Sequence, residues 1–300
     1  MPRISVIIPA HDAESTLAST VESAQRAGAD EIVVVDDGSR DGTRSLAHRL
    51  DGVTVIERDR PGGPAVARNA GLGASTGDFV VFLDSDDRLM PTSLTALLAA
   101  MSTGVVASLG RFLAVDDDDH PLDIGTWASE QLRPVVRRRG HYIPSPRGFS
   151  SEALVTRLVT PPPSGIMVRR AVAIRIGGYD VALRRSEDID FLVRLSREGT
   201  LAAVNEVVVH YRRTPSQRSQ ATGARQRGRL RALYRMIWTA PTRRERWAMA
   251  RGAAAHYFDR ADVRWHGAVS ARDRAIAVRS YFLGGGYRCL GLVAVLRSNS

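Results

Sequence analysis

The sequence predicts an α/β fold, with a mostly parallel sheet that carries helices on both faces. Three observations support this prediction. Short apolar runs alternate with helix-like segments over the first hundred residues, and uninterrupted apolar strands are typical of parallel sheets that are covered on both faces. Turn residues such as Gly and Pro separate the segments. The composition, 44% hydrophobic and 25% charged, is that of a globular chain.

The elements of the first hundred residues are predicted from their periodicity. The predicted strands are continuous apolar runs, at residues 4–10, 31–39, 53–59 and 78–87. The predicted helices have apolar residues every three or four positions, at residues 13–28, 41–50, 65–75 and 91–101. A Gly/Pro-rich turn, RPGGP, precedes the third helix.

The second half of the chain is less regular. Residues 116–148, which include DDDD and RRR, are predicted to be a loop or excursion. The body resumes at residues 161–180, and a helix at 186–199 and a strand at 201–212 follow. From about residue 225 we expect helices, because residues 230–237 and 247–258 carry apolar stripes at helical spacing.

The net charge of +10 is unevenly distributed. All 42 basic residues are Arg, and residues 211–300 hold 19 of them against four acids, a net charge of +15. Residues 1–210 hold 23 Arg against 28 acids, a net charge of −5. A basic region of this kind could contact nucleic acid, an anionic membrane surface, or only solvent around packed helices. No nucleic-acid motif accompanies it, so nucleic acid is the least favoured partner.

Signals for location are few. Met1–Arg3 runs directly into a strand-like segment, and no window has the roughly 18 apolar residues expected of a spanning helix. The single cysteine, Cys289, excludes an internal disulfide. We therefore expect a cytoplasmic protein, with a possible peripheral contact at the inner face of a membrane.

Three carboxylates follow the fourth predicted strand, in the stretch DFVVFLDSDD. Asp84, Asp86 and Asp87 would repel one another unless a cation is bound nearby. The Asp-x-Asp spacing of Asp84 and Asp86 suits a divalent metal such as Mg²⁺, which takes one or two carboxylates and completes its shell with water and phosphate oxygens. The alternative is a solvated loop or a helix N-cap before Pro91.

Other charged residues could take part in ligand binding or catalysis. Asp37 follows the second strand, where a carboxylate could accept an N–H of a nucleobase or a ribose hydroxyl, although turn chemistry is the alternative. Arg68 could pair with a phosphate or with these acids. Glu187 and Asp188 open a helix, where they could supply a general base or only favour the helix dipole.

Taken together, these stretches resemble a known family. In order they are VIIPAHDAESTL, VVVDDGSRDGT, ARNAGL, DFVVFLDSDD, GGYD and SEDIDFLVRL. Across about residues 3–215 the chain resembles the family-two glycosyltransferases, which have the GT-A fold, a Rossmann-like mostly parallel sheet. The resemblance implies transfer of a sugar from a nucleotide diphosphate-sugar to an acceptor hydroxyl with inversion, dependent on Mg²⁺ or Mn²⁺.

The resemblance also implies roles for individual residues. The nucleoside pocket would be lined by Pro9, Ala10 and His11, with Asp37 at the nucleobase and Arg68 on the base or phosphate side. Asp84 would lie at the ribose and the metal, Ser85 would belong to the donor-binding residues, and Asp86 would bind the metal. In the Glu187-Asp188 pair, Asp188 would be the catalytic base, with Glu187 the other candidate.

Two departures from the family pattern affect these assignments. The family often has Tyr or Asn after the first strand, where this chain has His11-Asp12. Many members carry a His after a YRR-like strand end, but HYRRTP places Thr214 there, with His210 just upstream. The identity of a third metal-side ligand therefore stays open.

The predicted organisation is a nucleotide-sugar-binding and catalytic domain at residues 1–215, followed by a basic helical extension at 216–300. The predicted activity is that of an inverting glycosyltransferase in cell-envelope, polysaccharide or glycolipid synthesis. The acceptor could be a glycan, a lipid-linked sugar or a small molecule. The alternatives are a nucleotide-sugar binding module without catalysis and a nucleic-acid-binding protein that uses the basic region.

Overall fold

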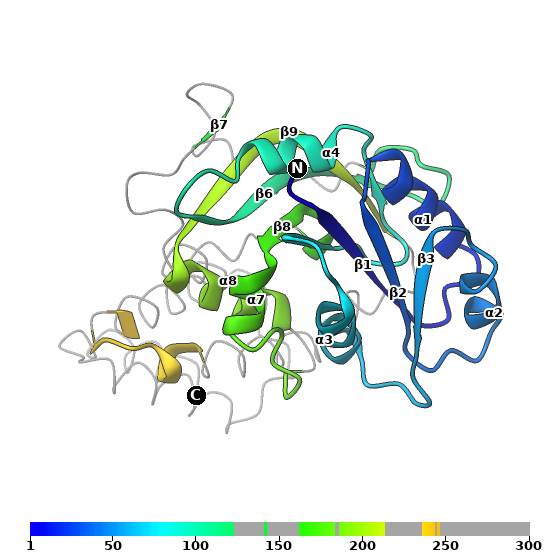
Figure 1. Cartoon of the computed structure of the whole chain (residues 1–300), viewed down its shortest axis with the longest axis horizontal. Helices are drawn as coiled ribbons and strands as arrows, with labels where there is room; N and C mark the ends of the chain where they lie inside the picture. Colours follow the sequence, from blue (N-terminus) through cyan, green and yellow to red (C-terminus); the bar gives the residue numbers. More distant parts are fainter. Residues whose placement is uncertain (123–140, 143–161, 184–185, 214–235, 244, 247–300) are drawn as a thin grey trace, which may run out of the picture.

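A nine-stranded sheet forms the centre of the molecule (Figure 1). The computed structural model describes residues 1–122, 141–142, 162–183, 186–213, 236–243 and 245–246. The strand order is β3-β2-β1-β4-β8-β6-β9-β5, and β7 pairs with β9 beside this path. The strands are β1 Ile4–Ala10, β2 Glu31–Asp36, β3 Val53–Glu57, β4 Phe79–Phe82, β5 Arg88–Leu89, β6 Val105–Val115, β7 His141–Tyr142, β8 Ile166–Arg169 and β9 Thr200–Arg212.

The helices follow the strands in the alternation that the sequence predicts. They are α1 Leu17–Arg26, α2 Thr43–Ala47, α3 Pro64–Ala74, α4 Ser93–Ala99, α7 Arg170–Arg175 and α8 Glu187–Glu198, with a 3₁₀ turn η1 at Pro163–Gly165. α1, α2 and α4 are shorter than their predicted segments, because turns occupy residues at their ends.

The first four elements of sheet are parallel, as predicted. β1 lies between β2 and β4, and β3 extends the sheet beyond β2. The register pairs Ala10 with Asp36 and Ile7 with Phe82, so the carboxyl ends of β1, β2 and β4 meet at one edge. This arrangement confirms that the acidic clusters of the sequence share an edge of one sheet.

The other side of the sheet is mixed. β8 runs antiparallel to both β4 and β6, whereas β6 and β9 are parallel with irregular register. No pattern in the sequence predicted β6 or the two-residue strands β5 and β7, of which β7 lies inside the predicted excursion 116–148. Strands of two residues carry no periodicity that a sequence pattern could reveal.

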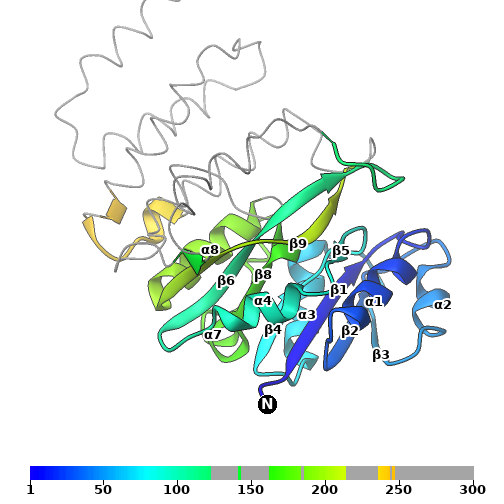
Figure 2. The same cartoon turned by 90° about the horizontal axis from the view of Figure 1, so that it is seen from above.

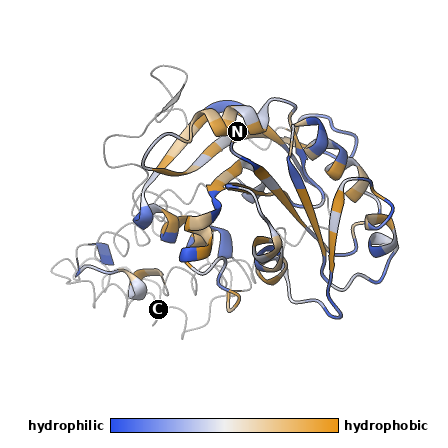
Figure 3. Ribbon diagram, in the orientation of Figure 1, coloured by the Kyte–Doolittle hydropathy of each residue, from blue (hydrophilic) through white to orange (hydrophobic). Residues whose placement is uncertain are grey.

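Helices cover both faces of the sheet, as predicted (Figures 1 and 2). Side chains alternate along β1: Ile7 packs with α3, α7 and α8 on one face, and Val6 and Ile8 pack with α1 and α4 on the other. Figure 3 shows that the strands are largely hydrophobic and that the connections beyond their ends are largely hydrophilic. The core is therefore two layers of side chains separated by the sheet.

The basic region beyond residue 213 is described only in part. Met236, Ile237 and Ala240 are buried in the same core cluster as α8. The rest of the two predicted stripes, 230–237 and 247–258, and most of the predicted extension 216–300 lie outside the described residues. Within the part of the chain that the structure describes, no helix is long and apolar enough to cross a membrane.

Candidate functional site

Asp36 and Asp37 end β2 and make different contacts. Asp36 is fully buried, and its Oδ2 accepts a hydrogen bond from Arg44 Nε at 2.8 Å. The Asp37 carboxylate accepts the backbone N–H groups of Gly62 and Gly63, at 3.0 Å and 2.7 Å, and pairs with Arg58. Asp37 therefore holds the turn that leads into α3 against the end of β2, a role that the sequence did not reveal.

The residues at the end of β1 lie beside Asp37. The Ala10 carbonyl accepts the Asp37 N–H at 2.8 Å, and His11 Nδ1 lies 3.0 Å from the Asp37 carbonyl oxygen. Ala10 is buried, whereas Pro9 and His11 are partly exposed. The predicted nucleoside pocket residues are thus brought together, and of these three Pro9 and His11 reach the surface.

Arg68 connects two of the predicted acidic clusters. Its side chain is only 4% exposed, and its guanidinium pairs with Asp84 Oδ1 at 2.6 Å and with Glu187 Oε1 at 3.1 Å. The Tyr179 ring lies under the guanidinium, with its centroid 5.1 Å from Cζ. The end of β4 and the start of α8, more than a hundred residues apart, are therefore joined by one cation.

Burial and charge determine the pKa values around Arg68. Burial alone would lower the pKa of Arg68, but the carboxylates of Asp84 and Glu187 raise it above its usual value. Burial raises the pKa of Glu187, as does the negative charge of Asp188, while Arg68 opposes both effects. Burial also raises the pKa of Tyr179, and charges on Asp84 and Asp188 add to the shift. The charges of Arg68, Asp84, Glu187 and Asp188 are therefore all close enough to Tyr179 to affect its pKa.

The loop before α8 is fastened to α3 by Asn69. The Asn69 side chain accepts the Tyr179 N–H at 2.7 Å and donates to the Tyr179 carbonyl at 2.8 Å. Gly178 has a φ of +65°, and a Cβ there would lie 2.3 Å from Asn69 Oδ1, so this position requires glycine. The ARN and GGYD stretches of the sequence thus form one clamp, which keeps Tyr179 beneath Arg68.

Buried hydroxyl groups of Ser164 and Thr20 support the Asp84–Asp87 turn. Ser164 Oγ accepts the Asp84 N–H at 3.1 Å and donates to Asp87 Oδ2 at 2.5 Å. Thr20 Oγ1 lies within hydrogen-bond distance of the carbonyls of both Ser85 and Asp87. Ser85 contributes this backbone contact at the turn. Ser164 and Thr20 were not recognised from the sequence, because isolated hydroxyl residues carry no motif.

Asp87 is the buried member of the acidic turn. Its carboxyl group is fully buried, and burial raises its pKa well above the usual value, with the charges of Asp86 and Asp84 adding to the shift. The hydroxyl of Ser164 and the backbone N–H of Arg212 partly offset this effect. Asp87 is thus a support of the turn, whereas Asp84 and Asp86 lie nearer the surface.

The donor atoms of the turn fit a hard divalent cation. Asp84 and Asp86 supply carboxylate oxygens, the ligands that Mg²⁺ and Mn²⁺ prefer. Among the described residues, no group of three or more His, Cys, Asp or Glu side chains could hold a metal ion. Within the described part of the chain, Asp84 and Asp86 would therefore be the carboxylate ligands, and the remaining ligands would be water and phosphate oxygens, as Mg²⁺ commonly has.

The three acids at the start of α8 have separate surroundings. Glu187 pairs with Arg68, and the buried Asp190 pairs with Arg194 Nε at 2.8 Å. Asp188 Oδ1 accepts the N–H of its neighbour Ile189 at 2.9 Å, and the residue is partly exposed. Among the described residues, Asp188 thus bonds within its own helix turn, whereas Glu187 and Asp190 each pair with an arginine.

His210 and Thr214 are the candidates for a third ligand near the metal. His210 lies in β9, opposite Arg88 of β5, and burial together with the charge of Arg88 lowers its pKa. Thr214 lies outside the described residues. The question that the sequence left open therefore stays open.

Comparisons with known proteins agree with this geometry. The family model described as Glycosyl transferase family 2 matches residues 5–173, more than half of the chain. The chain belongs to glycosyl transferase family 2. The match spans the elements that carry Asp37, Arg68 and the Asp84–Asp87 turn, whereas Glu187 and Asp188 lie beyond it.

Curated relatives in this family match parts of the chain. A succinoglycan biosynthesis protein ExoO of Rhizobium meliloti is 35% identical over 123 residues, which are 40% of this chain and 34% of that protein. A pre-mycofactocin glycosyltransferase of Mycobacterium tuberculosis is 30% identical over 218 residues, 70% of this chain and 43% of that protein. The chain thus spans less than two-thirds of the length of these relatives.

Solved structures establish the fold. The S. aureus TarS 1–349 structure in complex with UDP-GlcNAc matches with a TM-score of 0.70 at 17% identity, covering 93% of this chain and 79% of that one. At this identity the similarity concerns the fold alone. The predicted GT-A fold is therefore confirmed.

Proposed function

We propose that the chain is an inverting glycosyltransferase that moves a sugar from a nucleotide diphosphate-sugar to an acceptor hydroxyl. One observation carries the proposal: Arg68 joins the Asp84–Asp87 turn to the Glu187-Asp188 pair through contacts of 2.6 Å and 3.1 Å. A donor-binding turn and a candidate base are thus fixed relative to each other. Transfer requires this, because the acceptor must attack while the leaving group departs.

The donor is proposed to lie along the carboxyl edge of the sheet. The nucleoside would lie at Pro9, Ala10, His11 and the turn held by Asp37, and the diphosphate would lie at the Asp84–Asp87 turn, including Ser85. Asp84 and Asp86 would hold Mg²⁺ or Mn²⁺, which when bound neutralises charge on the leaving diphosphate. The fold neighbour TarS was solved with UDP-GlcNAc and with UDP, which supports a nucleotide-sugar donor.

Asp188 is proposed to act as the general base. Its carboxylate would take the proton of the acceptor hydroxyl as the hydroxyl oxygen bonds to the anomeric carbon and the bond to the diphosphate breaks, which inverts the configuration. Glu187 would remain paired with Arg68 and keep the start of α8 in place. Their contacts support this division, because Glu187 pairs with the buried Arg68, whereas among the described residues Asp188 accepts the N–H of Ile189.

The acceptor is proposed to belong to cell-envelope or polysaccharide synthesis. Relatives are named for succinoglycan biosynthesis, for teichuronic acid biosynthesis and for glucosyl transfer to an undecaprenol-linked glycan. A lipid-linked acceptor would suit a protein at the inner face of a membrane. The net charge of +15 over residues 211–300 supports a contact with anionic lipid there, in a domain that we place after residue 215.

Calorimetry tests the proposal directly. A panel of nucleoside diphosphates is titrated into the chain with and without Mn²⁺, and we expect one of them to bind more tightly when Mn²⁺ is present. Asp86→Asn keeps the shape of the side chain and removes its charge, so the gain from Mn²⁺ should fall by about tenfold or more. Asp51→Asn, in an exposed turn before β3, is the matched control and should behave as the unaltered chain.

The outcomes of this titration distinguish a glycosyltransferase from a binding module. If no diphosphate binds, both the glycosyltransferase and the binding-module readings fail. If diphosphate binds but no sugar is transferred from any donor tried, the chain is a nucleotide-sugar binding module. An Asp86→Asn variant with unchanged metal dependence would place the metal elsewhere.

A further inference from the structure

Arg212 ends β9 beside the acidic turn. Its side chain is only 9% exposed. A guanidinium stays charged and carries five N–H donors in a rigid plane, so its burial requires several acceptors. The acceptors that Arg212 uses determine what it can do at the candidate site.

Arg212 contacts the acidic turn through both its backbone and its side chain. The Arg212 backbone N–H donates to Asp87 Oδ1 at 3.0 Å, and its Nε donates to the Asp86 carbonyl at 3.2 Å. The proposed metal ligand Asp86 is therefore held at its carbonyl. Asp87, the buried support of the turn, is held at its carboxylate.

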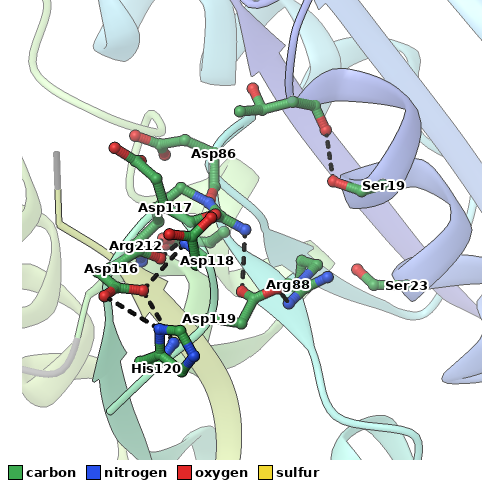
Figure 4. Close-up of polar contacts among 12 residues, drawn as sticks. Ser19, Ser23, Asp86, Arg88, Asp116, Asp117, Asp118, Asp119, His120 and Arg212 are labelled. Carbon is green, nitrogen blue, oxygen red and sulfur yellow. Dashed lines mark hydrogen bonds and ion pairs between the residues drawn. The ribbon is translucent and has the colours of Figure 1, made fainter. Parts of the chain in front are cut away.

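The other end of the guanidinium holds a second acidic segment. The two hydrogen bonds from NH1 go to the carbonyls of Asp116 and Asp117, at 3.0 Å and 2.6 Å, and NH2 pairs with Asp119 Oδ1 at 3.0 Å. Figure 4 shows Arg212 between Asp86 and this segment. Asp119 also pairs with Arg88, the residue that follows the acidic turn. The contacts thus close a ring from the turn through Arg212 and Asp119 back to the turn.

We propose that Arg212 is a positioning residue for the donor site, which fixes the backbone at Asp86 by fastening the acidic turn to residues 116–119. This inference rests on the proposed function. Three of the acceptors of Arg212 are the backbone carbonyls of Asp86, Asp116 and Asp117, and a planar guanidinium can reach all three together. The point charge of a lysine cannot, so the geometry of Arg212 matters in addition to its charge.

The consequence concerns preorganisation of the turn. Ser164 and Thr20 hold it on one side, and Arg212 holds it on the other. A carboxylate on a fixed backbone loses little freedom when it binds a cation, whereas a mobile one must be ordered first. Loss of the fork should therefore weaken cation binding while the carboxylate ligands themselves remain in the chain.

Arg169 provides a matched control at the opposite end of the sheet. It is also an arginine that binds carbonyls: its guanidinium donates to Val105, Met101 and Ser102, at 2.7 Å, 3.0 Å and 3.1 Å. Arg169 pairs in register with Phe79 at the start of β4, so it lies far along the strand from the acidic turn. Replacing either arginine by lysine removes the same kind of structural contact.

The experiment compares Arg212→Lys and Arg169→Lys in the full chain. Mn²⁺ is titrated in the presence of UDP, GDP, ADP, CDP or dTDP, whichever binds best to the unaltered chain, and thermal unfolding is recorded in parallel. Arg212→Lys should raise the Mn²⁺ concentration for half-maximal binding about tenfold, the lower end of the effect of residues that support a metal ligand. Arg169→Lys should destabilise the fold to a similar extent and leave this concentration unchanged.

Each result decides the proposal. An unchanged Mn²⁺ requirement in Arg212→Lys, or an equal change in Arg169→Lys, overturns it while the proposed function stands. If the unaltered chain binds none of the diphosphates, the proposed function fails and this inference fails with it. Should Arg212→Lys not fold, Asp119→Gly replaces it, because Asp119 has a φ of +65° that glycine tolerates. It should raise the Mn²⁺ requirement several-fold, and no rise would overturn the proposal.

Discussion

The two edges of the sheet use carboxylates in opposite ways. At the amino-terminal edge, each carboxylate accepts hydrogen bonds from a neighbouring strand or loop: Asp78 accepts the Arg3 N–H at 2.8 Å, and Glu31 accepts the Ser5 hydroxyl at 2.5 Å. At the carboxyl-terminal edge, three carboxylates crowd one turn, and a buried Arg68 links that turn to Glu187. The first edge distributes its charges, and the second concentrates them.

The pKa shifts record this difference. The pKa of Glu31 lies below its usual value, because hydrogen bonds from Ser5 and Thr76 outweigh the effect of burial. Burial raises the pKa of both Asp87 and Glu187, as do nearby negative charges. Charged carboxylates therefore stabilise the fold at one edge and destabilise it at the other. Such a concentration of charge fits the proposed binding of a cation and phosphates at this edge.

The largest effect should come from the proposed base at the carboxyl-terminal edge. Asp188→Asn removes the proton acceptor and keeps the side-chain shape, so transfer should fall about 10²–10⁴-fold, the range for loss of a general base. Binding of the nucleoside diphosphate should stay near that of the unaltered chain, because the base acts on the acceptor. A radiolabelled sugar-transfer assay and calorimetry on the same samples measure the two quantities.

Asp190→Asn is the control for this variant. Asp190 lies in the same helical turn but pairs with Arg194, so its loss should lower stability with little change in transfer per folded molecule. Transfer at the unaltered rate by Asp188→Asn would assign the base to another group, with Glu187 the first to test.

The next largest effect should come from Arg68, the buried cation that pairs with Asp84 and Glu187. Arg68→Gln leaves the carboxylates of Glu187, 15% exposed, and Asp84, 28% exposed, without their buried partner. Removing one partner of a buried pair costs about 3–5 kcal/mol, and the exposure of Asp84 favours the lower end. Urea unfolding measures the loss. Arg175→Gln, which breaks an ion pair whose arginine is 57% exposed, should cost about 0.5 kcal/mol.

The loss in Arg68→Gln should depend on pH. A carboxyl group with a raised folded-state pKa contributes stability below its unfolded-state pKa and loses it as pH rises through the folded-state value. Removing Arg68 removes the group that opposes the shift of Glu187. The deficit should therefore be small below the usual Glu pKa near 4.5 and grow as the pH rises. A deficit of equal size at every pH would mean that lost packing, not charge, explains it.

The sequence predicted the acidic residues of the carboxyl-terminal edge better than the contacts that support them. Asp84, Asp86 and Asp37 could be found because each follows an apolar run, and parallel strands bring such ends together. Ser164 could not be found in this way, since a single serine after three prolines resembles any turn. Its role depends on β8 pairing between β4 and β6, a non-local arrangement without a sequence signal.

The same limit applies to individual side chains. The family resemblance predicts Asp37 beside the nucleobase, but the sequence gave no sign that Arg58 and two glycine N–H groups bind its carboxylate. It grouped Glu187 and Asp188 together, and the structure separates them by partner. Periodicity predicts which element a residue occupies, whereas partners depend on packing between distant elements.

The smallest effect should come from the amino-terminal edge. The Glu31 carboxylate accepts the Ser5 hydroxyl at 2.5 Å and the Thr76 N–H at 2.8 Å, contacts that favour its charged form. Glu31→Gln should lower the free energy of unfolding at pH 7 by about 0.5–1 kcal/mol, because the group is partly exposed and its hydrogen bonds are correspondingly weak in effect. Metal-dependent diphosphate binding should not change.

The deficit of Glu31→Gln, like that of Arg68→Gln, should grow as the pH rises, but for a different reason. A depressed folded-state pKa contributes stability above the unfolded-state value, near 4.5, and that stability is lost as pH falls through the folded-state value. The deficit of Glu31→Gln should therefore be full at pH 7 and disappear as the pH falls through the folded-state pKa of Glu31. Glu22→Gln, in an exposed pair with Arg26, is the control and should show almost no deficit at either pH. If Glu31→Gln instead weakened Mn²⁺-dependent diphosphate binding, the two edges would be coupled, and the separation between a stabilising edge and a binding edge would not hold.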